Sequence, residues 1–76
     1  MSIIPIITSK QLLTILLKVG FKILRQRGSH IRLQHPMTKM STTIPMHAGD
    51  LSRKMITKIL KQAGLSVNEF IKFFRK

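Results

Sequence analysis

The residues of this chain best suited to chemistry are Gly28, Ser29 and His30, which follow one another directly. An ordinary imidazole titrates at about pH 6.5, so His30 can take up and release a proton near neutral pH. Gly28 permits the backbone of a tight turn, and the Ser29 hydroxyl can orient the imidazole or bind a phosphate. Basic side chains flank this triplet on both sides: Lys22, Arg25, Arg27 and Arg32. These residues alone leave three roles open for His30: proton transfer beside a bound phosphate, binding without catalysis, or a side chain that only faces solvent beside a hairpin turn.

Positive charge dominates the composition. The 76 residues include 14 Lys and Arg but only 2 Asp and Glu, which gives a formal net charge of +12. Such a surface attracts polyanions, so it favours nucleic acid, an anionic membrane or an acidic protein as partner. An apolar content of 43% is typical of a globular chain, and the length predicts one domain over residues 1–76. Because the chain has no cysteine, neither a disulfide framework nor a thiolate metal site can form.

The apolar stretches are too short for a membrane span. The longest, Ile3–Ile7 and Leu12–Val19, are interrupted by Pro5, Thr14 and Lys18. A spanning helix needs about 20 consecutive apolar residues. The N-terminus also lacks the basic segment and cleavage site of a signal peptide. We therefore expect a soluble, cytoplasmic protein without a membrane partner.

The first predicted element is a helix that begins after Thr8. Thr8 and Gln11 form a capping-box pattern, and Ile7 and Leu12 occupy the positions of a hydrophobic staple. Gly20 suits the left-handed residue that ends the helix. The expected buried stripe consists of Leu12, Leu13, Leu16 and Leu17.

Three short strands should follow, over Phe21–Gln26, His30–Gln34 and Met40–Ile44. The second alternates cleanly, and this puts Ile31 and Leu33 on one face. The opposite face should carry His30, Arg32 and Gln34. The segment His35–Lys39 is expected to form a turn, and Pro45 ends the third strand or restricts it to an edge. Tight connections between the strands predict an antiparallel meander.

Two helices should close the chain. The first, capped by Asp50 or Ser52 and stopped at Gly64, has a clear apolar face: Met55, Ile56, Ile59, Leu60 and Ala63. A second capping box, Ser66 to Glu69, starts the last helix, which buries Phe70, Ile71, Phe73 and Phe74. The order α-β-β-β-α-α predicts an α+β fold in which helices cover one face of a three-stranded antiparallel sheet. The other sheet face should be open to solvent.

From Thr8 to Phe74, the chain resembles the HicA (YcfA-like) toxin family in an ordered set of segments. These are Gly20-Phe21, Gly28-Ser29-His30, Ile44-Pro45-Met46-His47 and Ile59–Ser66. The resemblance implies a fold like that of the double-stranded RNA-binding domain, and an mRNA interferase held inactive by a HicB antitoxin. It also implies that His30 is the catalytic residue. Relatives often carry a basic residue at the position of Met46.

RNA cleavage suits a site built from one histidine and several cations. RNA carries its own nucleophile, the 2′-hydroxyl, so the protein must only transfer protons and stabilise charge on the phosphorane, and no metal is obligatory. The prediction is a metal-independent endoribonuclease with His30 as general acid/base and no cofactor. The residues expected to bind RNA are Lys22, Arg27, Gly28, Ser29 and Arg32. Whether the ribosome takes part stays open.

The other two histidines raise the alternative of a zinc site with His30, His35 and His47 as ligands. Only two carboxylates and no thiolate are available to complete it. A regular strand would also point His30 and His35 to opposite faces. The sequence therefore predicts no metal ion. His35 should lie in a turn, and for His47 packing and phosphate contact stay open.

Two further functions compete with RNA cleavage. A non-catalytic RNA-binding module of similar fold would use the same cations to track phosphates. A cationic membrane-active protein would need lipid to fold. The four phenylalanines are expected in the core rather than stacked on bases. Along the first helix after the sheet, Arg53, Lys54, Lys58 and Lys61 form either a phosphate-tracking surface or an ordinary solvated face.

Overall fold

The computed structural model describes residues 4–46 and 49–74. Its elements are α1 (Ser9–Val19), β1 (Lys22–Arg27), β2 (His30–Gln34), β3 (Ser41–Pro45), α2 (Arg53–Ala63) and α3 (Val67–Phe74). The strands form one antiparallel sheet in the order β1-β2-β3. The predicted α+β class, element order and meander are confirmed; β1 and β3 each begin one residue later than expected.

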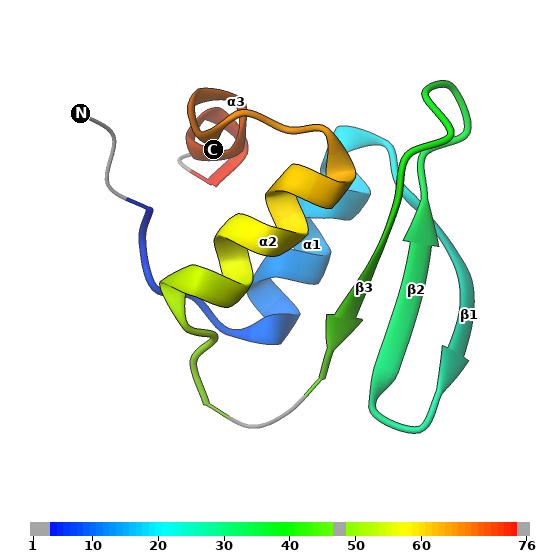
Figure 1. The fold of residues 1–76 in the computed structure, drawn as a ribbon, viewed down its shortest axis with the longest axis horizontal. Coiled ribbons are helices and arrows are strands. Elements are labelled where there is room, and N and C mark those ends of the chain that lie inside the picture. Colours follow the sequence, from blue (N-terminus) through cyan, green and yellow to red (C-terminus); the bar gives the residue numbers. More distant parts are fainter. Residues whose placement is uncertain (1–3, 47–48, 75–76) are drawn as a thin grey trace.

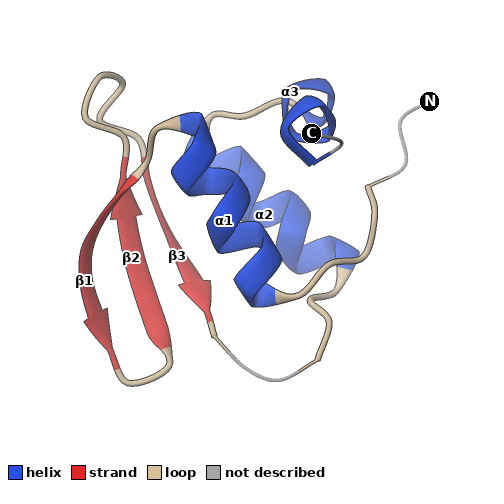
Figure 2. Ribbon diagram, turned by 180° about the vertical axis from the view of Figure 1, so that it is seen from behind, coloured by secondary structure: helices blue, strands red, loops and turns tan. Residues whose placement is uncertain are grey.

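The helices pack beside the β3 half of the sheet. Figure 1 shows α1 and α2 side by side next to β3, with α3 seen nearly end-on above them, away from the sheet. The reverse view in Figure 2 shows β1 as the strand farthest from the helices. Every residue of β1 is exposed, whereas β2 and β3 alternate between buried and accessible positions. The β1–β2 hairpin therefore projects from the body of the molecule, and β1 has solvent on both faces.

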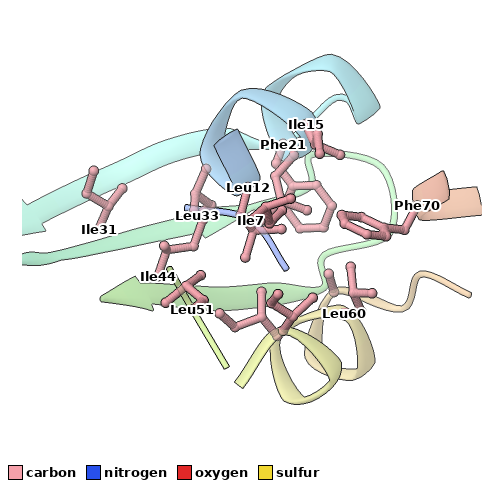
Figure 3. Close-up of a cluster of buried hydrophobic side chains, with 14 residues drawn as sticks. Ile7, Leu12, Ile15, Phe21, Ile31, Leu33, Ile44, Leu51, Leu60 and Phe70 are labelled. Carbon is pink, nitrogen blue, oxygen red and sulfur yellow. The ribbon is translucent and has the colours of Figure 1, made fainter. Parts of the chain in front are cut away.

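The core lies between the sheet and the three helices. Figure 3 shows side chains from β2 and β3 meeting those of the helices around Phe21 and Phe70. The buried apolar residues are Ile7, Leu12, Ile15, Leu16, Phe21, Ile31, Leu33, Ile44, Leu51, Ile56, Ile59, Leu60, Ala63 and Phe70. Ile31 and Leu33 are buried as the alternation of β2 predicted, which leaves His30 and Arg32 exposed.

Local capping fixes where the helices begin. In α1, the Gln11 backbone N–H donates to Thr8 Oγ1 at 3.2 Å, and Thr8 N–H donates to Gln11 Oε1 at 2.9 Å. In α2, Ser52 is the cap, since its hydroxyl accepts from Met55 N–H at 3.1 Å. These contacts confirm the first capping box and decide between Asp50 and Ser52.

The second predicted capping box is also confirmed, at the start of α3. Ser66 N–H donates to Glu69 Oε1 at 3.1 Å, and Glu69 N–H donates to Ser66 Oγ at 3.1 Å. The bonds from Ser66 lower the pKa of the Glu69 carboxyl below its ordinary value, because they favour the charged form. Glu69 is thus occupied in holding α3 in place.

The predicted buried stripe of α1 is wrong at Leu17, which is 44% exposed. At 3.6 residues per turn, Leu17 lies about 140° around the helix from Leu12 and so points away from the core. Ile15 takes its place in the buried face, together with Leu12 and Leu16. The burial expected for the aromatic residues holds for Phe21 and Phe70. Phe73 is only partly buried, and Phe74, the outermost ring of α3, is 39% exposed because it lies at the end of the helix.

Candidate functional site

A two-residue turn between β1 and β2 presents His30. Gly28 and Ser29 form the turn, and Arg27 pairs with His30 across its base. Gly28 has φ 58°, whereas Ser29 keeps a negative φ, which is the pattern of a type II′ hairpin turn. Glycine is favoured at the first central position because only it adopts this φ without strain. His30 is therefore the first residue of β2, at the tip of the hairpin.

The hairpin tip is held from the β3 side as well. His30 pairs with Pro45, and the backbone N–H of Met46 donates to the carbonyl of Ser29. Because hydrogen-bonded and non-hydrogen-bonded pairs alternate in an antiparallel ladder, His30 and Pro45 form a non-hydrogen-bonded pair, in which the missing N–H of proline costs no bond to β2. The backbone of His30 is thus fixed on both sides, and only its side chain is free to turn.

A bulge in β1 decides which side chains share a face with His30. The cross-strand pairs are Lys22–Gln34, Ile23–Leu33, Arg25–Arg32, Gln26–Ile31 and Arg27–His30. Leu24 has no residue opposite and is the extra residue of the bulge. The two-residue turn sets Arg27 opposite His30, and Arg25, two residues before Arg27, therefore lies on the same face. In a regular strand Ile23 would come next on that face, and the bulge replaces it with Lys22.

The result is a strongly basic sheet surface, which we call the open face. It consists of Lys22, Arg25, Arg27, His30, Arg32, Gln34, Ser41, Thr43 and Pro45. The four cations and His30 are all exposed. Of the residues expected to bind RNA, the structure thus brings Lys22, Arg27 and Arg32 onto one face with His30, and Gly28 and Ser29 beside it. Arg25 belongs with them and was missing from the predicted set.

A pocket of about 510 Å³ adjoins the open face and extends around the edge of β3 to α2. His30 and Arg32 line it from β2, and Lys58 and Gln62 line it from α2. The Arg32 guanidinium leans toward this side and donates to Ser41 Oγ at 3.4 Å. His30 therefore lies between the pocket on one side and its cross-strand neighbour Arg27 on the other.

The His30 ring makes no hydrogen bond within residues 4–46 and 49–74. Neither acid of the chain lines the pocket: Glu69 caps α3, and Asp50 forms a β-bridge with Thr8. His30 is thus available for proton transfer to a ligand, but no carboxylate orients it. The described residues also contain no group of three His, Cys, Asp or Glu side chains that could hold a metal ion.

His35 has a structural role in the turn where it was predicted. Its Nδ1 accepts from the backbone N–H groups of Met37 at 3.1 Å and Thr38 at 3.4 Å. Its ring also meets Phe21 edge-on, with centroids 5.2 Å apart. His47 lies outside the described residues. None of the four phenylalanines belongs to the open face, so base stacking there does not depend on an aromatic ring.

The His35 ring leaves no room for a side chain at Gly20. Gly20 has φ 123°, and a Cβ atom there would lie 2.9 Å from His35 Nε2. We expect Gly20→Ala to destabilise the fold by about 2 kcal/mol or more, because both the backbone and the contact become strained. Urea unfolding followed by circular dichroism measures this loss. Gly49→Ala is the control, since it also has positive φ but no atom within 4 Å of the added Cβ; an equal loss in both variants would exclude the His35 contact as a cause.

Residues 9–65 match the family described as the HicA toxin of bacterial toxin–antitoxin systems. The match extends over most of the chain and includes the hairpin, the open face and the pocket. The chain belongs to the HicA toxin family. No curated protein matches the chain in sequence.

Membership of the HicA family gives the chain the role of a toxin and implies an antitoxin as its partner. In the part of the chain that the structure describes, no helix is both long and apolar enough to cross a membrane. The HicA match ends at Leu65, before α3, although Phe70 of α3 is completely buried in the core. The last helix therefore completes the core that supports the HicA site.

Three residues near the site, Arg25, Lys58 and Gln62, are not among those that the sequence predicts to bind RNA. Arg25 was named only as one of the basic residues around the triplet, although its position two residues before Arg27 in the same strand predicts that the two share a face. Lys58 was considered only as one of four helix cations, and nothing in the sequence distinguishes it from Lys61. Gln62 carries no local signal because it reaches the site through packing between α2 and β3.

Proposed function

We propose that this toxin is a metal-independent endoribonuclease that cleaves mRNA, with His30 as its general acid/base. The observation that carries this proposal is the position of His30. Its exposed imidazole lies at the tip of the β1–β2 hairpin, on a face with four exposed cations, and lines a pocket. A phosphate bound by Arg27 and Arg32 would lie within reach of this ring.

The proposed reaction is a transesterification within the RNA. His30 takes the proton of the 2′-hydroxyl as this oxygen attacks the neighbouring phosphorus and forms a new O–P bond. The bond from phosphorus to the 5′-oxygen breaks, and the imidazolium or a solvent water returns a proton to that oxygen. Arg27 and Arg32 stabilise the charge that develops on the phosphorane oxygens. The products are a 2′,3′-cyclic phosphate and a 5′-hydroxyl.

The cations of the open face would bind the RNA backbone without regard to sequence. We expect Arg27→Ala to weaken binding of single-stranded RNA and to reduce the slope of log K against log salt by about 0.7, the value for one phosphate contact. Fluorescence anisotropy over a salt series measures this in the His30→Ala background, where no cleavage interferes. Lys10→Ala, which removes the same charge from α1, should leave the slope unchanged. Equal slopes for Arg27→Ala and its parent would remove Arg27 from the RNA surface.

The antitoxin in this proposal is a HicB-type protein that covers the open face. An acidic protein would complement the net charge of +12 and would keep RNA away from His30. Inhibition by occlusion requires no conformational change in the toxin.

The experiment that tests the proposed function uses purified toxin, an mRNA fragment and a chelator, with and without ribosomes. Cleavage by wild type in the chelator supports a metal-independent nuclease, and the two arms show whether the ribosome is required. Intact RNA in both arms together with tight, salt-sensitive binding would favour a non-catalytic RNA-binding module.

A further inference from the structure

The pocket between β3 and α2 has the composition of a site for one unstacked nucleobase. Its apolar surface comes from Pro45, Met55 and Ile59, and its charged members are Arg32 and Lys58, with no carboxylate. A volume of about 510 Å³ lies within the usual range of ligand pockets. Apolar walls beside cations suit a planar base that is attached to a phosphate.

Gln62 is the polar group held most firmly in this pocket. The hydroxyl of Thr42, which is 2% exposed, donates to Gln62 Oε1 at 2.9 Å. This hydrogen bond fixes the orientation of the Gln62 amide and occupies its oxygen. The Nε2 group makes no hydrogen bond to any described residue. Gln62 therefore offers two N–H donors to a ligand, and every nucleobase has ring-nitrogen or carbonyl acceptors for them.

The position of the pocket also suits a nucleotide next to the phosphate that is cleaved. His30 lines it and at the same time faces Arg27 across the hairpin. If the phosphate to be cleaved lies at His30, the base of an adjoining nucleotide falls at the pocket, with Lys58 near the next phosphate. The guanidinium plane of Arg32 offers a surface for stacking where no aromatic ring is present.

Resting on the proposed function, we propose that this pocket binds the base of one nucleotide next to the cut and that Gln62 contributes to the choice of sequence. Lys58 binds the adjoining phosphate. These two residues of α2 would thus give a nuclease with a sequence-independent basic face its preference for particular sites.

The test uses RNA oligonucleotides in which each nucleotide around the cut is in turn replaced by an abasic residue. For wild type, we expect one abasic position to lower kcat/KM by about tenfold, as for the loss of a hydrogen bond and a packed base. In Gln62→Met, the difference in kcat/KM between the intact and the abasic oligonucleotide should largely disappear. Gln62→Glu should have the same effect, although it keeps an oxygen that accepts from Thr42. Lys58→Met should raise KM, whereas Lys61→Met removes the same charge outside the pocket and should not.

Two results would overturn the pocket assignment. One is an abasic scan with no sensitive position next to the cut, and the other is a Gln62→Met protein with the same scan and KM as Lys61→Met. Failure of the proposed function is distinct, because wild type would then cleave none of the oligonucleotides. In that case the pocket is tested by measuring the binding of the same oligonucleotides by fluorescence anisotropy. If the pocket binds a base, one abasic position weakens binding to wild type but not to Gln62→Met.

Discussion

Replacing His30 with alanine is expected to lower the rate of RNA cleavage by about 10²–10⁴-fold, the usual contribution of a general acid/base. The fold should be unaffected, since the His30 side chain is exposed and makes no hydrogen bond within the described residues. Exposed substitutions of this kind change stability by about 0.5 kcal/mol or less. Activity and stability are therefore expected to separate cleanly in this variant.

The measurement is the single-turnover rate on a labelled mRNA fragment, with a thermal unfolding curve for each protein. Lys10→Ala is the control, because Lys10 is an exposed residue of α1 that belongs neither to the open face nor to the pocket. It should cleave at the wild-type rate. If His30→Ala also cleaves at that rate, the histidine has no part in the chemistry.

The largest expected effect on stability is that of Phe70→Ala, at about 3–5 kcal/mol. Phe70 is 0% exposed and joins α3 to the core. A chain of this length is stabilised by roughly 4–11 kcal/mol in total, at 0.05–0.15 kcal/mol per residue. The substitution should therefore remove a large part of the stability of the fold, and urea unfolding followed by circular dichroism measures it.

Phe74→Ala is the natural comparison because the two rings belong to the same helix and stack with centroids 6.2 Å apart. Phe74 is 39% exposed, so its removal should cost about 1.5 kcal/mol or less. Similar losses in both variants would mean that α3 is not anchored through Phe70. The expected difference would establish that α3, although outside the matched family segment, is required for the fold.

The helix starts could be predicted from sequence because capping is local. Thr8 with Gln11 and Ser66 with Glu69 each lie three residues apart, and their side chains satisfy the backbone groups of the same turn. The two faces of β2 could be predicted in the same way, since its buried and exposed residues alternate with a period of two. These local patterns place His30 correctly at the open face.

The composition of the site depends on contacts that the sequence does not display. The bulge at Leu24 exists only because β1 pairs with β2, and without it Ile23 rather than Lys22 would lie on the face of His30. Gln62 reaches the pocket through its bond to Thr42, which is 20 residues away in the sequence. Strand pairing and helix packing, rather than residue type, thus bring these side chains to His30.

The chemical nature of the RNA ends gives the most direct measurement of His30 catalysis through the 2′-hydroxyl. Wild-type toxin is incubated with an mRNA fragment in the presence of a chelator, and the termini of the fragments are identified by mass spectrometry. Attack by the 2′-hydroxyl predicts 2′,3′-cyclic phosphates and 5′-hydroxyls, and the same ends should be absent with His30→Ala. Fragments with 3′-hydroxyls and 5′-phosphates would contradict this mechanism, because they require water rather than the RNA itself as the nucleophile.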